Sequence, residues 1–147
     1  MKSSIAMLLV AFCTLGTGAG AQNHSSQPST ASCPLAVDIS PVHLYGLWRA
    51  DFEGLPQGAT LQLERHAELA GSVSGSVNRD GVKALVAGDV DRGEFTLEES
   101  LDGQGIAATW LGSVVEGSCG KEVRGIWNNT SNNGSYPFVL RKQPGWQ

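Results

Sequence analysis

The feature that most constrains this chain is a strict alternation of apolar and polar residues that begins near Tyr45. In residues 69–77, leucine, glycine or valine fills every second position, with alanine or serine between. A period of two is typical of a β-strand with one dry and one wet face, because successive side chains point to opposite sides. No stretch carries a helical stripe of useful length. The predicted strands cover residues 45–52, 61–64, 69–77, 82–90, 94–99, 106–114, 122–128 and 136–142.

These eight segments predict an all-β fold, an eight-stranded antiparallel up-and-down β-barrel with one disulfide. Short connections with turn-forming residues, such as Arg79-Asp80-Gly81, join consecutive strands. Glycine is abundant, with 19 residues, and several glycines fall on the dry face. Dry-face glycines favour a closed barrel over a β-sandwich, the alternative, because they relieve crowding where strands coil tightly. They stand at positions 46, 71, 75, 88, 112 and 125.

The first residues predict export. A short positive start at Lys2 leads into an apolar run from Ile5 to Leu15, and small residues at 19–21 fit a cleavage site. The run holds about 11 residues, too few for the roughly 20 that span a bilayer, although a retained anchor is the alternative. We therefore expect a secreted or periplasmic protein with no membrane span. The predicted organisation is a signal peptide at 1–21, a flexible leader and link at 22–43, the barrel at 44–142 and a tail at 143–147.

The cysteines support the same compartment. Cys13 lies in the segment predicted to be removed, which leaves Cys33 and Cys119. In an oxidising compartment such a pair normally forms a disulfide; two free thiols are the alternative. In an up-and-down barrel successive connections alternate between the two ends, so both cysteines fall at the end where the first strand begins. We therefore predict a structural disulfide there.

Composition and motifs argue against several function classes. The formal net charge is −4, and a nucleic-acid-binding domain would instead carry a basic stripe. The histidines and cysteines lack metal-ligand spacing, and no phosphate loop or nucleophile elbow occurs. Glu98 and Glu99 are neighbours on a predicted strand, so they point to opposite faces and cannot act together on one substrate. We expect no enzyme activity, cofactor, metal or nucleic-acid partner.

Two short motifs resemble the calycin group of lipocalins, fatty-acid-binding proteins and avidins. Gly46-x-Trp48 opens the first strand, and Arg141 lies near the end of the last. The segment 108–112, which contains Trp110, is similar to the sixth strand of avidins. The resemblance covers roughly residues 45–142. It implies that Trp48 packs under Arg141 and that this structural pair plugs one end of the barrel.

The opposite, open end carries the candidate ligand-binding residues. Its connections are 53–59, 79–81, 101–105 and the polar 129–135. By alternation several aromatic side chains and one carboxylate face inward near this rim, which suits a small ligand or a captured side chain. The alternative is that the aromatic rings simply fill a narrow barrel. The predicted ligand-binding residues are Phe52, Glu99, Trp110, Trp127 and Tyr136.

The outer wall carries a candidate interface. On four strands that are neighbours in a closed barrel, the outward positions hold Leu47, Leu111, Ile126 and Val139. Adjacent exposed aliphatic side chains often mark contact with another copy or a partner. Two hypotheses follow. The first is an exported binding module that holds a small apolar ligand at its open end. The second is a protein-interaction or inhibitor protein with a filled interior, which uses its loops or outer wall.

Overall fold

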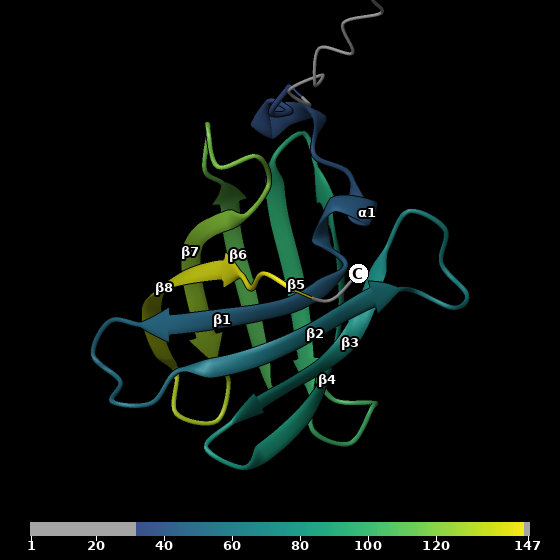
Figure 1. Cartoon of the computed structure of the whole chain (residues 1–147). Helices are drawn as coiled ribbons and strands as arrows, with labels where there is room; N and C mark the ends of the chain where they lie inside the picture. The colour runs from purple at the N-terminus through teal and green to yellow at the C-terminus, as the bar shows by residue number, and fades with distance from the viewer. Residues whose placement is uncertain (1–31, 146–147) are drawn as a thin grey trace, which may run out of the picture. The chain divides into compact units, whose positions relative to one another are not determined.

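The computed structural model describes residues 32–145. Within them eight strands form a closed antiparallel barrel in the order β1 to β8, with β8 paired to β1 (Figure 1). This confirms the predicted fold. The strands are β1 (Gly46–Phe52), β2 (Ala59–Arg65), β3 (Val73–Arg79), β4 (Val82–Asp91), β5 (Glu94–Ser100), β6 (Ala108–Val114), β7 (Glu122–Asn129) and β8 (Gly134–Lys142). A 3₁₀ turn, η1 (Ala36–Asp38), and the short helix α1 (Pro41–Leu44) precede them.

Some predicted boundaries lie outside the described residues. The expected signal peptide at 1–21, the first part of the leader at 22–31 and the last two tail residues, 146–147, belong to this group. Among residues 32–145, neither of the helical segments combines the length and apolar character that crossing a membrane requires.

Two strands begin later than their sequence patterns predict. The third begins at Val73 rather than Leu69, and Leu69 is 58% exposed. Residues 66–72 instead form a loop, in which the His66 ring Nδ1 accepts the backbone N–H groups of Glu68 and Leu69 at 3.1 and 3.0 Å. The sixth begins at Ala108, and Ile106 is exposed in the preceding connection. Both predictions were wrong at the strand start, because alternation continued by chance into a loop.

The predicted role of glycine holds at four of the six positions. A Cβ added at Gly75 or Gly88 would lie 1.9 Å from a backbone oxygen of the adjacent strand, and one at Gly125 or Gly112 would lie 2.0 or 2.5 Å away. No side chain fits so close, and the tightly coiled wall therefore requires glycine there. The remaining two, Gly46 and Gly71, differ because their φ angles are positive.

The closed end of the barrel is covered by α1 and its flanking residues. Leu44 and Ile39 are buried there, and the Trp48 indole N–H donates to the Leu44 carbonyl at 2.7 Å. The cation above Trp48 is Lys142, whose Nζ lies 5.8 Å from the centroid of the ring. The predicted partner Arg141 lies on the outer wall instead.

This corrects the structural pairing expected from the calycin resemblance. Arg141 is opposite Arg49 across the β1–β8 ladder, whereas Lys142 is opposite Trp48. Side chains that are opposite each other in a ladder share a face. The closed end is therefore plugged by Trp48 and Lys142.

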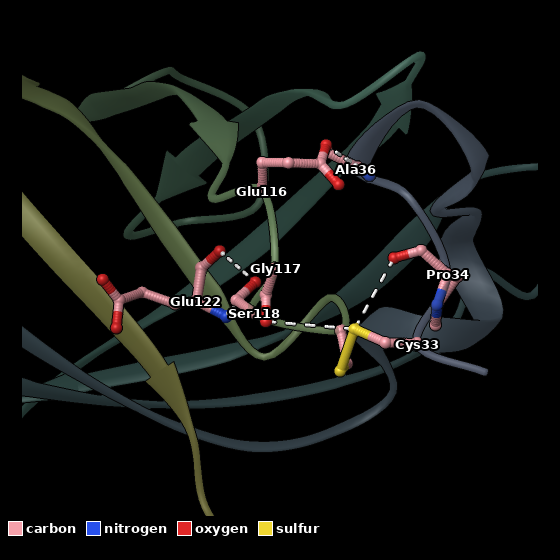
Figure 2. The surroundings of a disulfide bond; sticks show 8 residues. Cys33, Pro34, Ala36, Glu116, Gly117, Ser118 and Glu122 are labelled. Atoms are coloured by element: carbon pink, nitrogen blue, oxygen red, sulfur yellow. Dashed lines mark hydrogen bonds between the residues drawn. A yellow bond between two sulfur atoms is a disulfide. The ribbon is translucent and has the colours of Figure 1, made fainter. Parts of the chain in front are cut away.

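The disulfide Cys33–Cys119 forms as predicted. It joins the segment before η1 to the β6–β7 connection, at the end where β1 begins (Figure 2). Beside it the Ala36 backbone N–H donates to the Glu116 carboxylate at 3.1 Å. The bond and this contact hold the N-terminal segment to the β6–β7 connection.

Candidate functional site

A buried carboxylate organises the open end of the barrel. Glu99 on β5 is 1% exposed, and its Oε2 accepts the indole N–H of Trp110 at 3.2 Å and that of Trp127 at 3.1 Å. Its Oε1 accepts Nη2 of Arg79 at 2.8 Å. The ion pair and the two indole donors satisfy both oxygens, which offsets the desolvation of the buried charge.

Arg79 lies between this carboxylate and the surface. It ends β3, and its guanidinium carbon is 4.3 Å from the centroid of the Trp127 ring, a cation–π distance. Its side chain remains 19% exposed. Arg79 thus covers the buried carboxylate and contributes to the accessible surface. Arg79 was not among the predicted site residues, although the alternation of Val73 and Val77 along β3 continues to it and indicates that it faces inward.

The predicted aromatic residues do come together. The ring centroid of Phe52 lies 5.4 Å from that of Trp110 and 5.3 Å from that of Trp127, and Trp127 lies 5.8 Å from Tyr136. Phe138, which was not predicted, lies 5.1 Å from Trp110 and completes the cluster. Phe52 and Trp110 are buried within the core. These rings pack against one another in the core of the barrel.

A shallow hollow of about 280 Å³ lies at the open end. Trp127 and Tyr136 line it, and so does Arg79. Of the five predicted ligand-binding residues, Phe52, Trp110 and Glu99 lie behind this surface. The remaining lining side chains come from the β1–β2, β3–β4 and β7–β8 connections and their flanks: Leu55, Gln57, Asp80, Asn129 and Asn132.

The outer wall carries an aliphatic patch that differs from the predicted one by a single residue, with Pro137 in place of Leu47. Leu111, Ile126 and Pro137 are directly opposite one another across β6, β7 and β8, and Leu111 and Ile126 are exposed. Val139 lies in the next cross-strand row, opposite Arg124. We call these four residues, Leu111, Ile126, Pro137 and Val139, the aliphatic patch.

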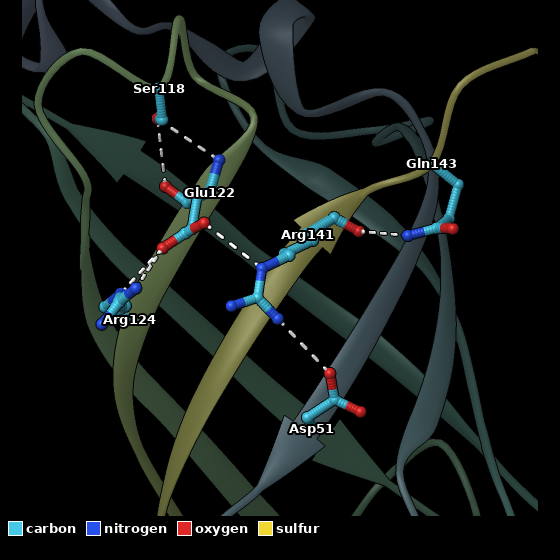
Figure 3. A network of polar contacts seen from close by, with 6 residues as sticks. All are labelled: Asp51, Ser118, Glu122, Arg124, Arg141 and Gln143. Carbon is cyan, nitrogen blue, oxygen red and sulfur yellow. Dashed lines mark hydrogen bonds and ion pairs between the residues drawn. The ribbon is translucent and has the colours of Figure 1, made fainter.

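Leu47 does not join this patch. Between them runs a row of charged side chains that includes Arg141 and Glu122 (Figure 3). The Arg141 guanidinium donates to Glu122 at 3.3 Å and to Asp51 at 3.5 Å, and Arg124 donates to Glu122 at 2.7 Å. The prediction that Leu47 belongs to a contiguous set of four aliphatic side chains is therefore wrong.

The same contacts set the ionisation of Glu122. Hydrogen bonding from Arg124 lowers the pKa of this carboxyl below its ordinary value, and the charge of Arg141 adds to the effect. The stabilisation from the ionised form is present at neutral pH and is lost as the pH falls through the lowered pKa. Because the Glu122 carboxylate and its two arginine partners are close to water, these ion pairs contribute little to the free energy of unfolding.

Two other kinds of site, a metal site and a pair of converging carboxylates, find little support in the described part of the chain. Residues 32–145 hold no group of three or more His, Cys, Asp or Glu side chains arranged to bind a metal. Glu98 is exposed while Glu99 is buried, so the two carboxylates diverge. In comparisons with known proteins, no family model matches this chain, and no curated protein matches its sequence.

Proposed function

We propose that this chain is a non-catalytic binding module that holds a small ligand at its open end. The observation that carries the proposal is the surroundings of Trp127. The Arg79 guanidinium lies over its ring, and the ring of Tyr136 lies beside it. All three line one hollow. Aromatic surfaces with a few convergent polar groups are the usual composition of a ligand site.

The lining favours a neutral, flat ligand with hydrogen-bonding edges. Glu99 already balances the charge of Arg79, so this cation attracts an anion only weakly. The amides of Gln57, Asn129 and Asn132 offer donors and acceptors, and the partly exposed ring of Tyr136 offers a surface for stacking. Of the apolar or amphipathic ligands that the sequence suggested, an amphipathic ligand therefore fits this lining better.

The aromatic cluster beside the hollow limits the size of this ligand. The volume of the hollow, about 280 Å³, is just below the roughly 300–1,000 Å³ range of ordinary pockets. The ligand rests on the aromatic cluster rather than inside the barrel. A single flat ring with a polar substituent suits that space.

We also propose that the protein works outside the cytoplasm, secreted or in the periplasm. The apolar segment from Ile5 to Leu15 supports export, and so does the bond between Cys33 and Cys119. A calycin-like origin is supported by Trp48 beneath a last-strand cation, Lys142.

Nicotinamide and benzamide are suitable first probes, because each is neutral, flat and bears one amide. We expect them to change the tryptophan fluorescence at millimolar concentration or below. Tyr136→Ala should weaken the binding at least about fivefold, since it removes a stacking surface. Val82→Ala, at an exposed site on β4, is the control. If neither probe binds, and native mass spectrometry of the protein from its own host shows no bound small molecule, the proposal fails.

A second candidate function is protein interaction through the outer wall. It is favoured by the filled interior together with the exposed side chains of Leu111 and Ile126. We expect Leu111→Glu/Ile126→Lys to reduce the sedimentation-derived mass of an oligomer to that of a monomer. Leu69→Glu, in the exposed 66–72 loop, is the control. A wild type that stays monomeric at high concentration, and binds nothing in host extract through this face, contradicts this candidate.

A further inference from the structure

A second, larger hollow lies at the closed end of the barrel, on the side where α1 meets β1 and the end of β8. Its volume is about 770 Å³. The hollow is separate from the open-end site, with which it shares no lining residue. Its lining includes Val42, Tyr45, Leu47, Lys121, Lys142 and Pro144.

The two lysines give this hollow a positive charge that no side chain of residues 32–145 neutralises in an ion pair. Within residues 32–145 every ion pair involves an arginine, and none involves a lysine. In the part of the chain that the structure describes, no carboxylate side chain lines the hollow. Lys121 and Lys142 are held near each other because the Lys142 backbone N–H donates to the Lys121 carbonyl at 2.9 Å. Two like charges side by side attract an anion.

Lys142 is held in place and still has donors to offer. Its Nζ donates to the His43 carbonyl at 2.7 Å and lies over the Trp48 ring. An ammonium group has three N–H donors, so two remain for a ligand. Partial burial lowers the pKa of Lys142, and the charge of Lys121 lowers it further. A bound anion would offset both effects.

The remainder of the lining combines apolar surface with two polar side chains, His43 and Gln143. Val42 is 60% exposed, and Tyr45, Leu47 and Pro144 present apolar surface beside the lysines. Cys119 of the disulfide also lines the hollow, which ties this wall to the N-terminal segment. An inorganic anion would leave this surface unused, whereas an organic anion with an apolar body would cover it.

We propose that the closed-end hollow binds a small amphipathic organic anion. Its acidic group lies between Lys121 and Lys142, and its apolar body lies on Tyr45, Leu47 and Val42. This makes the chain a protein with two separate small-molecule sites, one neutral at the open end and one cationic at the closed end.

Titration calorimetry of the oxidised protein with 2-naphthoate tests the proposal. Lys121 is exposed, so Lys121→Gln should fold normally while it removes one of the two charges. We expect this variant to weaken 2-naphthoate binding about tenfold, as the loss of a charge-assisted hydrogen bond does. Lys83→Gln, which removes the exposed lysine of β4, should leave the affinity unchanged.

Two further ligands separate the acidic group from the apolar body. The neutral analogue 2-naphthylmethanol should bind at least about tenfold more weakly than 2-naphthoate, and inorganic phosphate should bind more weakly still. The proposal is overturned if 2-naphthoate does not bind at millimolar concentration, or if Lys121→Gln binds it as well as the Lys83→Gln control does. Equal affinity for the neutral analogue, or for phosphate, also overturns it.

Discussion

Replacing Glu99 with glutamine is expected to lower the free energy of unfolding by about 2–4 kcal/mol. The substitution keeps the shape of the side chain and removes the charge that Arg79 contacts at 2.8 Å. The guanidinium then lies beside Trp127 without its counter-ion. Loss of one partner from a fully buried pair costs about 3–5 kcal/mol. Arg79 is partly exposed and can turn toward water, which reduces the expected cost.

Urea unfolding measures this effect, and Glu98→Gln is the matched control. Glu98 is the exposed neighbour of Glu99 on β5, so the same chemical change there should alter stability by less than about 0.5 kcal/mol. The double variant Glu99→Gln/Arg79→Met should recover much of the lost stability, because it removes the guanidinium that has lost its counter-ion, while the glutamine oxygen can still accept the indole N–H groups of Trp110 and Trp127. Equal stability of Glu99→Gln and Glu98→Gln would contradict a structural role for this ion pair.

Removing the disulfide with Cys33→Ser/Cys119→Ser should lower the free energy of unfolding by about 4 kcal/mol. The two cysteines are 86 positions apart, and β1 to β6 lie between them in the chain. In the chain-entropy account, opening so long a loop gives the unfolded state more freedom and therefore stabilises it.

Wild-type protein treated with a thiol reductant is the control for the serine substitutions. It should unfold at the same urea concentration as the double variant, since both lose the same cross-link. The far-ultraviolet circular dichroism of both should remain that of a β-barrel, because the strand ladders do not depend on the bond. A loss of less than about 1 kcal/mol would show that the bond constrains the unfolded chain far less than this account predicts.

The barrel could be predicted because its signal is local. Alternation in β5 assigns Phe95, Leu97 and Glu99 to one face and their neighbours to the other, and the structure buries only the first set. In an up-and-down barrel successive connections alternate between the two ends, and this rule correctly predicted that Cys33 and Cys119 lie at the same end. Neither inference needs knowledge of the register between strands.

The wrong predictions concern residue positions that depend on the register between strands or on the conformation of the loops. The choice of Arg141 over Lys142 followed a motif resemblance, although the alternation that turns Tyr136 inward also turns Lys142 inward. Leu47 was assigned to the interface because its strand, β1, is a neighbour of β8. The register places Leu47 and Ile126 in different cross-strand rows, so they are not adjacent. The partnership between Arg79 and Glu99 joins residues 20 positions apart, and no local pattern in the sequence indicates it.

The proposed ligand site was predicted only in part for a similar reason. The sequence indicated which aromatic side chains face inward, but side-chain packing decides which of them remain accessible. Phe52, Trp110 and Trp127 are all buried, and of the four predicted rings only that of Tyr136 is partly exposed. The lining amides come from connections whose conformation carries no periodic signal. The hollow therefore became visible only with the structure.

The most direct test of the open-end site is an NMR titration that follows the tryptophan indole N–H signals of ¹⁵N-labelled protein with nicotinamide. Trp127 lines the open-end hollow, whereas Trp48 lies buried at the closed end; Trp→Phe variants assign their signals. We predict that the Trp127 signal shifts in a saturable manner while the Trp48 signal stays in place, and that Tyr136→Ala weakens the saturation. A Trp127 signal that does not move up to millimolar nicotinamide, or that moves no more than that of Trp48, would contradict ligand binding at the open end.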